Sequence, residues 1–371
     1  METLPTLKRV RRLTLIPGMK LVCMSDMHRG DGSGADDFAQ NSLIYRCALE
    51  HYLESGFTYI ELGDAEELWE NDNFDQIYIT HTMVYELLAK FHDPDPAKSR
   101  YLKVWGNHDL YWKDNEAVYR TLFPDIEIYE GVVLEAGLRE GGSEASGEDA
   151  IGDGRGGAMP PGVGESGGDG RGADPRAGAA GGACTPSRPE DGAPSPTCMP
   201  TPKPGAILLI HGHQADPKCC GELAAVSKFF VHNFWPDLQR VGIKDPTRAA
   251  LNPGLCNEVD KRLHEWANNN DQGIAAIIAG HTHRAVFENL SLTEQRYLES
   301  KVRTDGVSFK HQPDRSYFNT GSCVHPLCIT GIEITFENGP CLRLVKWGQA
   351  TEGNALTIQR TVLEETEPGG H

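Results

Sequence analysis

The sequence predicts an α/β fold, and three features support this prediction. Short apolar runs recur along the chain, and several end in a turn that contains Gly, Asp, Asn or His. Segments with helical spacing of apolar residues follow the early runs, at 36–55 and 75–93. Strand, polar turn and helix recur three times within about 90 residues. That order is typical of a sheet with parallel strands and right-handed crossover connections.

Each predicted strand is a short run of apolar or β-branched residues bounded by turn residues. The run Lys20–Met24 is nearly all apolar, as expected for a strand that is covered on both faces. Glu337-Asn338-Gly339 predicts a hairpin between two late strands. Strands are predicted at 13–16, 20–24, 57–62, 101–105, 132–135, 206–210, 274–279, 317–324, 329–336, 341–347 and 356–362. We expect the last four to complete a second sheet.

Residues 139–204 differ in kind from the rest of the chain. Gly, Ala, Pro, Ser and Asp dominate this segment, and it has no hydrophobic period. Such a composition cannot bury enough apolar surface to offset the entropy lost on ordering. We therefore predict one domain interrupted by a disordered insertion. Its parts are a first half at 1–138, the insertion at 139–204, a second half at 205–363 and a tail at 364–371.

The second half contains a helical stretch at 221–268 that is the candidate lid. Its first part, 221–241, is amphipathic and rich in Phe, and a further helix is predicted at 256–268. This stretch could pack onto the sheets, or it could cover a pocket for an apolar group of a substrate. The sequence leaves both readings open.

The composition excludes several classes of partner. The chain of 371 residues has a formal charge of −18 and a pI near 5.2. An acidic surface argues against non-specific binding to nucleic acid, so no nucleic-acid partner is expected. The ten cysteines follow neither a zinc-site nor a disulfide spacing, which favours thiols in a reducing compartment. No apolar run approaches the roughly 20 residues of a membrane helix. We therefore predict a cytoplasmic protein without a transmembrane segment.

Residue types that bind metal ions follow five of the predicted strands. The set is Asp26, His28, Asp64, Asn107, His108, His211, His281 and His283. Two pairs in it are spaced by two residues, which lets both side chains of a pair point to the same side. Ligands of α/β sheets gather at the carboxyl ends of strands, so we expect these side chains to meet. A single His or Gly-Asp at a strand end is usually an ordinary turn residue; five such sets favour a shared site.

The chemistry of this set selects among metals. Imidazole, carboxylate and amide oxygen suit Mn²⁺, Fe or Zn²⁺ better than Ca²⁺. The set contains no thiolate, which argues against a structural zinc site. The sequence therefore predicts a metal centre of the kind that binds and activates small ligands.

Five motifs together resemble the calcineurin-like metallophosphoesterase family. They are Asp26-x-His28, Gly63-Asp64-x-x-Glu67, Gly106-Asn107-His108-Asp109, His211-Gly212-His213 and Gly280-His281-Thr282-His283. The resemblance spans about residues 20–290, apart from the insertion. It implies a four-layer α-β-β-α sandwich with two divalent metal ions, Mn²⁺ first and Fe or Zn²⁺ as alternatives. It assigns one ion to Asp26, His28, Asp64 and His283, and the other to Asp64, Asn107, His211 and His281.

The resemblance also implies a reaction, the hydrolysis of a phosphoester by a hydroxide that bridges the two ions. His108 would protonate the leaving oxygen or stabilise the phosphoryl oxygens, and Asp109 would orient its imidazole. Arg29 and Arg284 directly follow ligand motifs, so each could contact a non-bridging oxygen or simply be a solvated surface residue. His213 could reach the substrate or could serve the structure alone.

The expected substrate is a small phosphoester, either a phosphodiester, a pyrophosphate or a phosphomonoester. Gly280-His281-Thr282-His283-Arg284 and the helical stretch resemble the UDP-diacylglucosamine pyrophosphohydrolase branch, whose substrate is a peripheral lipid. His108 stands where we expect Arg in that branch. A phosphoprotein (Ser/Thr) phosphatase and a non-catalytic binding scaffold of the same fold are the alternatives. A nuclease would need a basic groove to bind DNA. The sequence does not predict the oligomeric state.

Overall fold

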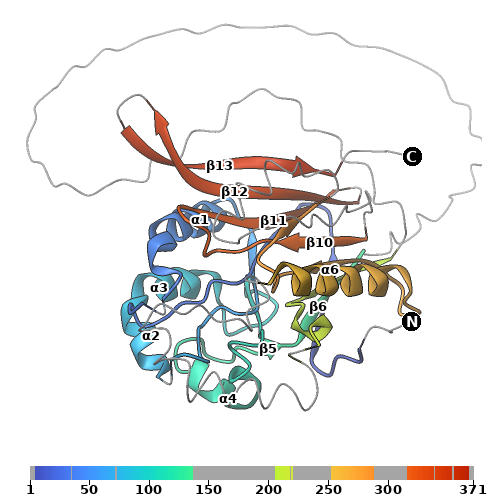
Figure 1. Cartoon of the computed structure of the whole chain (residues 1–371), viewed down its shortest axis with the longest axis horizontal. Helices are drawn as coiled ribbons and strands as arrows, with labels where there is room; N and C mark the ends of the chain where they lie inside the picture. Colours follow the sequence, from blue (N-terminus) through green and yellow to red (C-terminus); the bar gives the residue numbers. More distant parts are fainter. Residues whose placement is uncertain are drawn as a thin grey trace, which may run out of the picture. The chain divides into compact units, whose positions relative to one another are not determined.

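The computed structural model is a mixed α/β fold built on two mixed β-sheets (Figure 1). It describes residues 5–34, 36–71, 73–136, 205–217, 219, 252–287, 316–337, 339–352 and 355–366. These residues belong to one compact unit, Met1–Gly137 together with Cys184–His371. The predicted insertion at 139–204 and the first part of the candidate lid, 221–241, lie outside the described residues.

The larger sheet has seven strands in the order β13-β12-β11-β2-β3-β4-β5. Their bounds are Met19–Met24 (β2), Thr58–Leu62 (β3), Tyr101–Val104 (β4), Ile128–Tyr129 (β5), Cys328–Phe336 (β11), Pro340–Glu352 (β12) and Ala355–Glu365 (β13). Strands β2 to β5 are parallel, so their carboxyl ends share one edge. The hairpin predicted at 337–339 joins β11 and β12, which lie beside β13 in red in Figure 1.

The smaller sheet has six strands in the order β1-β6-β7-β8-β10-β9. Their bounds are Val10–Leu15 (β1), Gly131–Ala136 (β6), Ala206–Ile210 (β7), Ile274–Ala279 (β8), Ala285–Val286 (β9) and Tyr317–Thr320 (β10). Strands β7, β8 and β10 are parallel. Of the four late strands expected in a second sheet, β10 pairs with β8, whereas β11, β12 and β13 extend the sheet of β2. Strand β13 also continues two residues into the predicted tail, to Glu365.

Five α-helices and two short 3-10 helices lie within the described residues. Their bounds are Ala39–Asn41 (η1), Ser42–Glu54 (α1), Phe74–Thr80 (α2), Thr82–Phe91 (α3), Trp112–Tyr119 (α4), His213–Ala215 (η2) and Pro253–Asn268 (α6). The helix predicted at 75–93 is divided at His81, where the backbone leaves helical geometry. Helix α6 begins three residues before the predicted 256–268, because the Asn252 side chain accepts from the Leu255 amide and Pro253 occupies the first turn. Helix α4 was not predicted.

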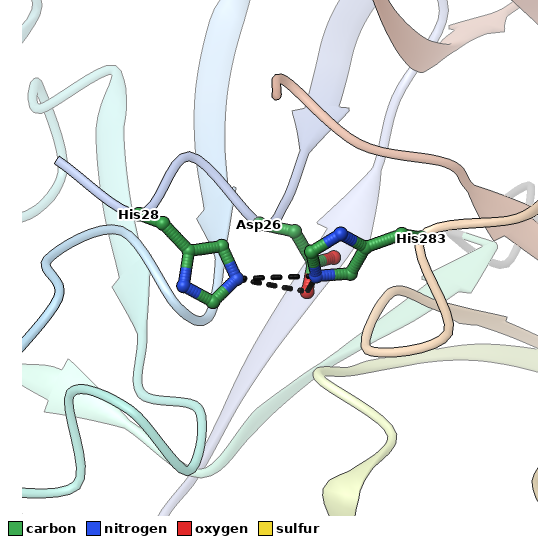
Figure 2. A group of neighbouring side chains, drawn as sticks. All are labelled: Asp26, His28 and His283. Atoms are coloured by element: carbon green, nitrogen blue, oxygen red, sulfur yellow. Dashed lines mark hydrogen bonds and ion pairs between the residues drawn. The ribbon is translucent and has the colours of Figure 1, made fainter. Parts of the chain in front are cut away.

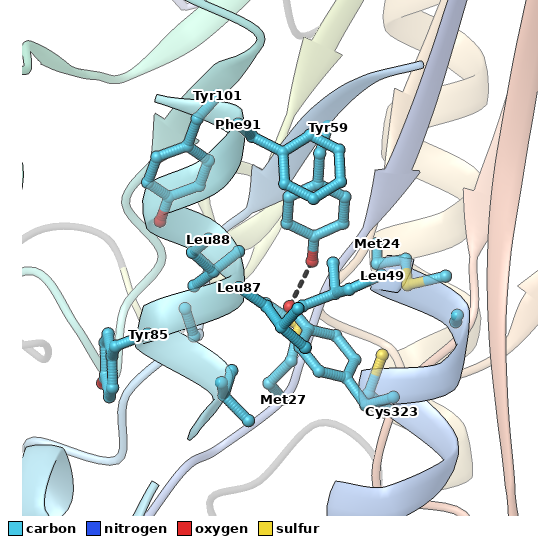
Figure 3. Packing of buried hydrophobic residues seen from close by; sticks show 14 of the residues in the cluster. Met24, Met27, Leu49, Tyr59, Tyr85, Leu87, Leu88, Phe91, Tyr101 and Cys323 are labelled. Carbon is cyan, nitrogen blue, oxygen red and sulfur yellow. Dashed lines mark hydrogen bonds between the residues drawn. The ribbon is translucent and has the colours of Figure 1, made fainter. Parts of the chain in front are cut away.

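Three clusters of buried apolar residues hold these elements together. One joins the two sheets, with Ile60 of β3 and Leu209 of β7 among its members. A second packs α1 to α4 against the seven-stranded sheet, and Figure 3 shows Tyr59, Phe91 and Tyr101 side by side in it. The third packs α6 against the six-stranded sheet. Burial of this apolar surface is the main favourable term in folding.

Two predictions from composition can be compared with the structure. Within the described ranges, no helix combines the length and apolar character needed to cross a bilayer. The described cysteines that are free thiols are Cys23, Cys219, Cys256, Cys323 and Cys328. Cys47 and Cys341 instead take part in disulfide bonds, so the expectation of thiols throughout is wrong for these two.

Candidate metal centre

In each sheet, the predicted metal-binding residues follow neighbouring parallel strands, whose carboxyl ends lie along one edge of that sheet. Those after β2, β3 and β4 come from the seven-stranded sheet, and those after β7 and β8 come from the six-stranded sheet. The two edges meet at two short contacts. His211 Nε2 lies 3.1 Å from Asp64 Oδ2, and His283 Nε2 lies 3.1 Å from Asp26 Oδ1. The structure therefore brings side chains from five separate loops together.

The first group consists of Asp26, His28 and His283, whose ligand atoms all lie within 4.8 Å of one another. Figure 2 shows the His28 imidazole to one side of the Asp26 carboxylate, which overlaps the His283 ring in this view. The Nε2 atoms of His28 and His283 are only 3.1 Å apart, and His28 Nε2 is 3.9 Å from Asp26 Oδ1. Asp64 Oδ2 lies 3.9 Å from His28 Nε2, so its carboxylate adjoins this group.

The second group consists of Asp64, His211 and His281, whose ligand atoms also lie within 4.8 Å of one another. The backbone amide of His108 donates to Asp64 Oδ1 over 2.8 Å, which places the loop of Asn107 against this carboxylate. Asp64 thus borders both groups. A carboxylate in that position can offer one oxygen to each of two neighbouring cations.

Three buried ligand atoms at the site bond to no group other than a neighbouring ligand residue. They are Asp26 Oδ1, Asn107 Oδ1 and His211 Nε2. Unpaired buried polar atoms cost free energy, and few persist in native proteins. A carboxylate oxygen, an amide oxygen and an imidazole nitrogen are the donors that a Mn²⁺, Fe or Zn²⁺ ion accepts. The donor set and its unpaired atoms therefore fit divalent metal ions.

The backbone of this site is strained. Among the described non-glycine residues, positive φ occurs at Asp26, His28, Asp64, Asp125, His281, His283 and Leu327, with values from 49° to 69°. Five of those seven belong to the two groups. The left-handed region costs an L-residue roughly 1–3 kcal/mol, and such strain gathers at functional sites. It also turns consecutive side chains away from the directions that a regular strand would give them.

Glycines allow the loops to approach one another. A Cβ on Gly63 would lie 2.5 Å from the His211 ring, and Gly63 has φ of +87°. A Cβ on Gly106 would collide with the Asp64 carboxylate. The glycines of these motifs are thus needed because a metal-binding side chain from a neighbouring loop occupies the space beside them.

Opposite charges shift the pKa values of the group. Burial raises the pKa of Asp64, but His211 and His108 lower it well below the usual carboxyl range. Burial lowers the pKa of His211, but Asp64 and Asp26 raise it to about 9. For His28 burial dominates, and its pKa falls below the usual value. The carboxylates are therefore ionised at neutral pH and concentrate negative charge where cations would bind.

His108 is oriented by Glu67 and not by Asp109, so this part of the prediction is wrong. One oxygen of Glu67 lies 2.7 Å from His108 Nδ1, and the other lies 2.7 Å from His28 Nδ1. Asp109 accepts from the backbone amides of Gly106 and Ala65 over 2.5 and 3.0 Å. Since Asp109 is buried among backbone donors, it closes its own turn onto the β3 loop instead of holding the imidazole.

The structure does not bring Arg29 or Arg284 to the metal-binding groups. Arg29 is fully buried, and its two terminal nitrogens lie 2.7 Å from Glu61 and 2.5 Å from Glu66. A substrate cannot reach this guanidinium, so its predicted role is wrong. Arg284 turns toward α6, where it donates to Asn257 over 2.7 Å.

His213 lies beside the second group, with its ring centroid 5.5 Å from that of His211. Burial lowers its pKa well below the usual value, and the nearby His211 and His281 lower it further. This imidazole is therefore neutral at physiological pH. A neutral ring can donate or accept a single hydrogen bond at each nitrogen but offers no charge to a phosphate.

Three residues next to the groups were not proposed from the sequence as site residues. Glu67 supports two imidazoles, and its spacing three residues after Asp64 was its only signal. Asp216 Oδ2 lies 3.0 Å from His281 Nε2, which fixes that ring. Trp69 stacks on His108 with ring centroids 4.4 Å apart and an interplanar angle of 24°. Carboxylates behind ligand histidines are typical of metal sites.

Comparison with known proteins assigns this chain to no family. No protein-family model matches this chain, and no curated protein matches its sequence.

Proposed function

We propose that this chain is a metal-dependent phosphoric ester hydrolase of the calcineurin-like metallophosphoesterase type. The observation that carries the proposal is the meeting of five strand-end loops in two adjoining groups, where three buried ligand atoms bond to no group other than a neighbouring ligand residue. Asp64 borders both groups, as expected for a centre that holds two ions. The order of the five motifs along the chain supports the same family.

The four-layer α-β-β-α arrangement belongs to this proposal. The support for it is the division of the buried apolar residues into three clusters. One joins the sheets, one lies under α1 to α4, and one lies under α6. Helix–sheet, sheet–sheet and sheet–helix contacts in that order describe a sandwich of four layers.

The residues that would hold the metals are those of the sequence prediction. One ion would take Asp26, His28, Asp64 and His283, and the other would take Asp64, Asn107, His211 and His281. Two divalent ions there, Mn²⁺ first, would supply positive charge that favours deprotonation of water and binds phosphoryl oxygens. Asp216 and Glu67 hold their histidine ligands in one ring orientation.

His108 is the residue that moves a proton. Because its Nδ1 faces Glu67, its Nε2 lies on the opposite edge of the ring and is the atom that can protonate a leaving oxygen. The Glu67 carboxylate stabilises the imidazolium form that this role requires. Trp69, stacked on one face of the ring, limits its rotation.

The substrate we propose is a small phosphodiester, pyrophosphate or phosphomonoester. The chain's charge of −18 disfavours a long polyanion such as nucleic acid, whereas a small anion can be neutralised locally by the metals. A lipid substrate would depend on the stretch at 221–241, which lies outside the described residues. No observation within those residues favours a phosphoprotein substrate.

The experiment that tests the proposal is a metal-supplemented activity screen of the full chain. Phosphomonoesters, an aryl phosphodiester and nucleotide pyrophosphates would each be offered with Mn²⁺, Fe²⁺ or Zn²⁺. We expect hydrolysis of at least one class, with loss of activity on chelation. A chain that binds two metals and hydrolyses none of these would instead support the non-catalytic scaffold.

A further inference from the structure

Four charged side chains are fully buried behind the candidate metal centre. Arg29, Glu61, Glu66 and Lys103 each have an exposed fraction of 0%. We call these four residues the buried charge cluster. They come from three strand–loop units, namely β2 with its loop, β3 with its loop, and β4. Charged side chains are almost never fully buried unless they are paired, so their arrangement needs a reason.

The four charges form a closed set of ion pairs. Arg29 contacts Glu61 over 2.7 Å and Glu66 over 2.5 Å. Lys103 contacts the second oxygen of each carboxylate, at 3.0 Å for Glu61 and 2.8 Å for Glu66. Each cation thus bridges both anions, and two positive charges balance two negative ones. This balance keeps every member ionised despite burial.

Aromatic side chains from the surrounding elements complete the hydrogen bonding. Tyr101 donates to Glu61 over 2.6 Å, while Tyr85 and Trp112 donate to Glu66 over 3.1 and 2.8 Å. Tyr85 lies in α3 and Trp112 in α4, so the helices that cover the seven-stranded sheet take part. Tyr85 and Tyr101 also appear in the packing of Figure 3.

The buried charge cluster is connected to the loops that carry the metal-binding side chains. Arg29 directly follows His28, and its backbone amide donates to the Ala65 carbonyl over 3.0 Å. Glu67, which supports His28 and His108, donates from its amide to the Arg29 carbonyl over 3.0 Å. The loops after β2 and β3 therefore run side by side, joined by backbone bonds next to Arg29 and Glu66.

Lys103 extends this connection to the third loop. Its Nζ lies 3.7 Å from Asp109 Oδ2. Asp109 in turn accepts from the amides of Gly106 and Ala65. One buried ammonium group is thus shared between the β3 side and the loop that bears Asn107 and His108.

We propose that the buried charge cluster is a positioning unit that fixes the loops after β2, β3 and β4 in the arrangement that binds metal. Ionic pairs have directional contacts that an apolar core lacks, so they specify one relative placement of the loops. Buried ion pairs are a poor source of stability, because apolar residues of similar volume often stabilise a fold equally well. The cluster should therefore matter more for metal affinity than for folding. This inference rests on the metal centre proposed above.

The test exchanges one ion pair for neutral side chains in the full chain, as Lys103→Met with Glu61→Gln. One positive and one negative charge are removed together, and the single Gln oxygen can still accept from Arg29 or from Tyr101, whose bonds go to different oxygens of Glu61. Mn²⁺ binding is measured by titration calorimetry, and unfolding is measured by thermal denaturation without metal. We expect Mn²⁺ affinity to fall by about 10–100-fold, as for other residues that support metal ligands. The melting temperature should change no more than in the control below.

A matched control is the exchange Arg360→Met with Glu333→Gln. This pair joins β13 to β11, with contacts of 2.7 and 2.5 Å and Glu333 only 2% exposed. Within the described residues, these two side chains bond to each other, and Glu333 also accepts from Tyr52, away from the loops of the metal centre. The control should lose stability without losing Mn²⁺ affinity.

The outcomes separate this inference from the proposed function. Absence of Mn²⁺ binding by the unchanged chain would contradict the proposed function itself. Binding by the unchanged chain with equal affinity in the Lys103→Met, Glu61→Gln variant would overturn the positioning role alone. If that variant does not fold, Glu66→Gln replaces it, since the single Gln oxygen can still accept from Trp112 or from Tyr85. A folded Glu66→Gln chain with unchanged Mn²⁺ affinity would likewise overturn the inference.

Discussion

Two buried polar groups lie next to each other in this chain, and they differ in how their atoms are paired. At the metal centre, Asn107 Oδ1 has no hydrogen-bond partner, while Asp26 Oδ1 and His211 Nε2 face only other ligand atoms, each at 3.1 Å. In the buried charge cluster, the buried polar atoms of the Glu61, Glu66 and Lys103 side chains all have a hydrogen-bond partner. Within this cluster, Arg29 Nε is the one buried polar atom without a partner. Burial alone therefore does not indicate a binding site. A binding site is indicated instead by buried ligand atoms that bond to nothing outside the site, because the fold keeps them despite their free-energy cost.

The two groups also differ in backbone geometry. Asp26, His28, Asp64, His281 and His283 adopt positive φ, whereas no member of the buried charge cluster does. Five of the seven described non-glycine residues with positive φ would contact metal, and the paired charges beside them do not adopt positive φ. This contrast supports a division of labour in which one group binds and the other holds the loops in place.

The largest expected effect is on catalysis. His108→Ala should lower phosphoester hydrolysis by roughly 10²–10⁴-fold, because a positioned general acid contributes about that much. Steady-state rates with an aryl phosphodiester and Mn²⁺ measure it, alongside the metal content of the variant. His92→Ala is the control, since His92 contacts Ser99, Phe123 and the Pro124 carbonyl and, within the described part of the chain, none of the metal-binding residues. An unchanged rate in His108→Ala would remove this residue from the mechanism.

The next effect concerns the carboxylate that supports two imidazoles. Glu67→Gln should weaken Mn²⁺ binding by about 10–100-fold, because an amide cannot act as an anionic acceptor for both His28 and His108. Titration calorimetry measures the affinity. Glu333→Gln, another buried carboxylate, should leave it unchanged. Equal affinities in the two variants would show that Glu67 is not part of the metal centre.

A smaller effect separates backbone strain from crowding at the site. Gly63 and Gly18 have φ of +87° and +88°, but a Cβ on Gly63 would lie 2.5 Å from the His211 ring, whereas a Cβ on Gly18 would meet nothing within 4 Å. Both Ala variants should lose about 1–2 kcal/mol of unfolding free energy from the left-handed backbone. Only Gly63→Ala should also lose metal binding. Denaturant titration and calorimetry measure the two quantities, and equal behaviour of the variants would contradict the crowding argument.

The smallest effect tests the buried charge cluster by pH. Burial raises the pKa of Glu61, but Arg29 and Lys103, with the Tyr101 hydroxyl, lower it from 4.5 to about 2. A carboxyl with a lowered folded pKa stabilises the fold above its unfolded pKa, and this contribution is lost as pH falls from about 4.5 toward 2. Between pH 4.5 and 3.5 the unchanged chain should lose about 1 kcal/mol more stability than Glu61→Gln. Denaturant titrations at the two pH values measure the difference, and parallel losses would contradict the assigned pKa.

The sequence predicted the strands of both sheets except the short β5 and β9, because apolar runs that end in Gly, Asp, Asn or His are a local signal. It also singled out the metal-binding set from Asp26 to His283, but not Glu67, Trp69 and Asp216 beside it. What it could not predict was the direction of each side chain. Arg29 follows a ligand motif like a substrate-binding residue, yet it turns into the core, because Glu61 and Glu66 are there.

Contacts between distant segments were also beyond local reasoning. Asp109 adjoins His108 in sequence, but its carboxylate accepts from backbone amides, while Glu67 from the preceding loop reaches the imidazole. Pairing of Lys103 with both Glu61 and Glu66 needs the register of β3 against β4, which places Glu61 opposite Lys103. Helix α4 was missed because its buried side, Trp112 and Tyr119, is short and interrupted by a non-helical Asn115.

Metal stoichiometry tests the central claim most directly. Elemental analysis of the full chain, equilibrated with Mn²⁺ and freed of excess metal, should give two ions per chain, and Asp64→Ala should give one or none because Asp64 borders both groups. Less than one ion in the unchanged chain, or two in the Asp64→Ala chain, would contradict the account.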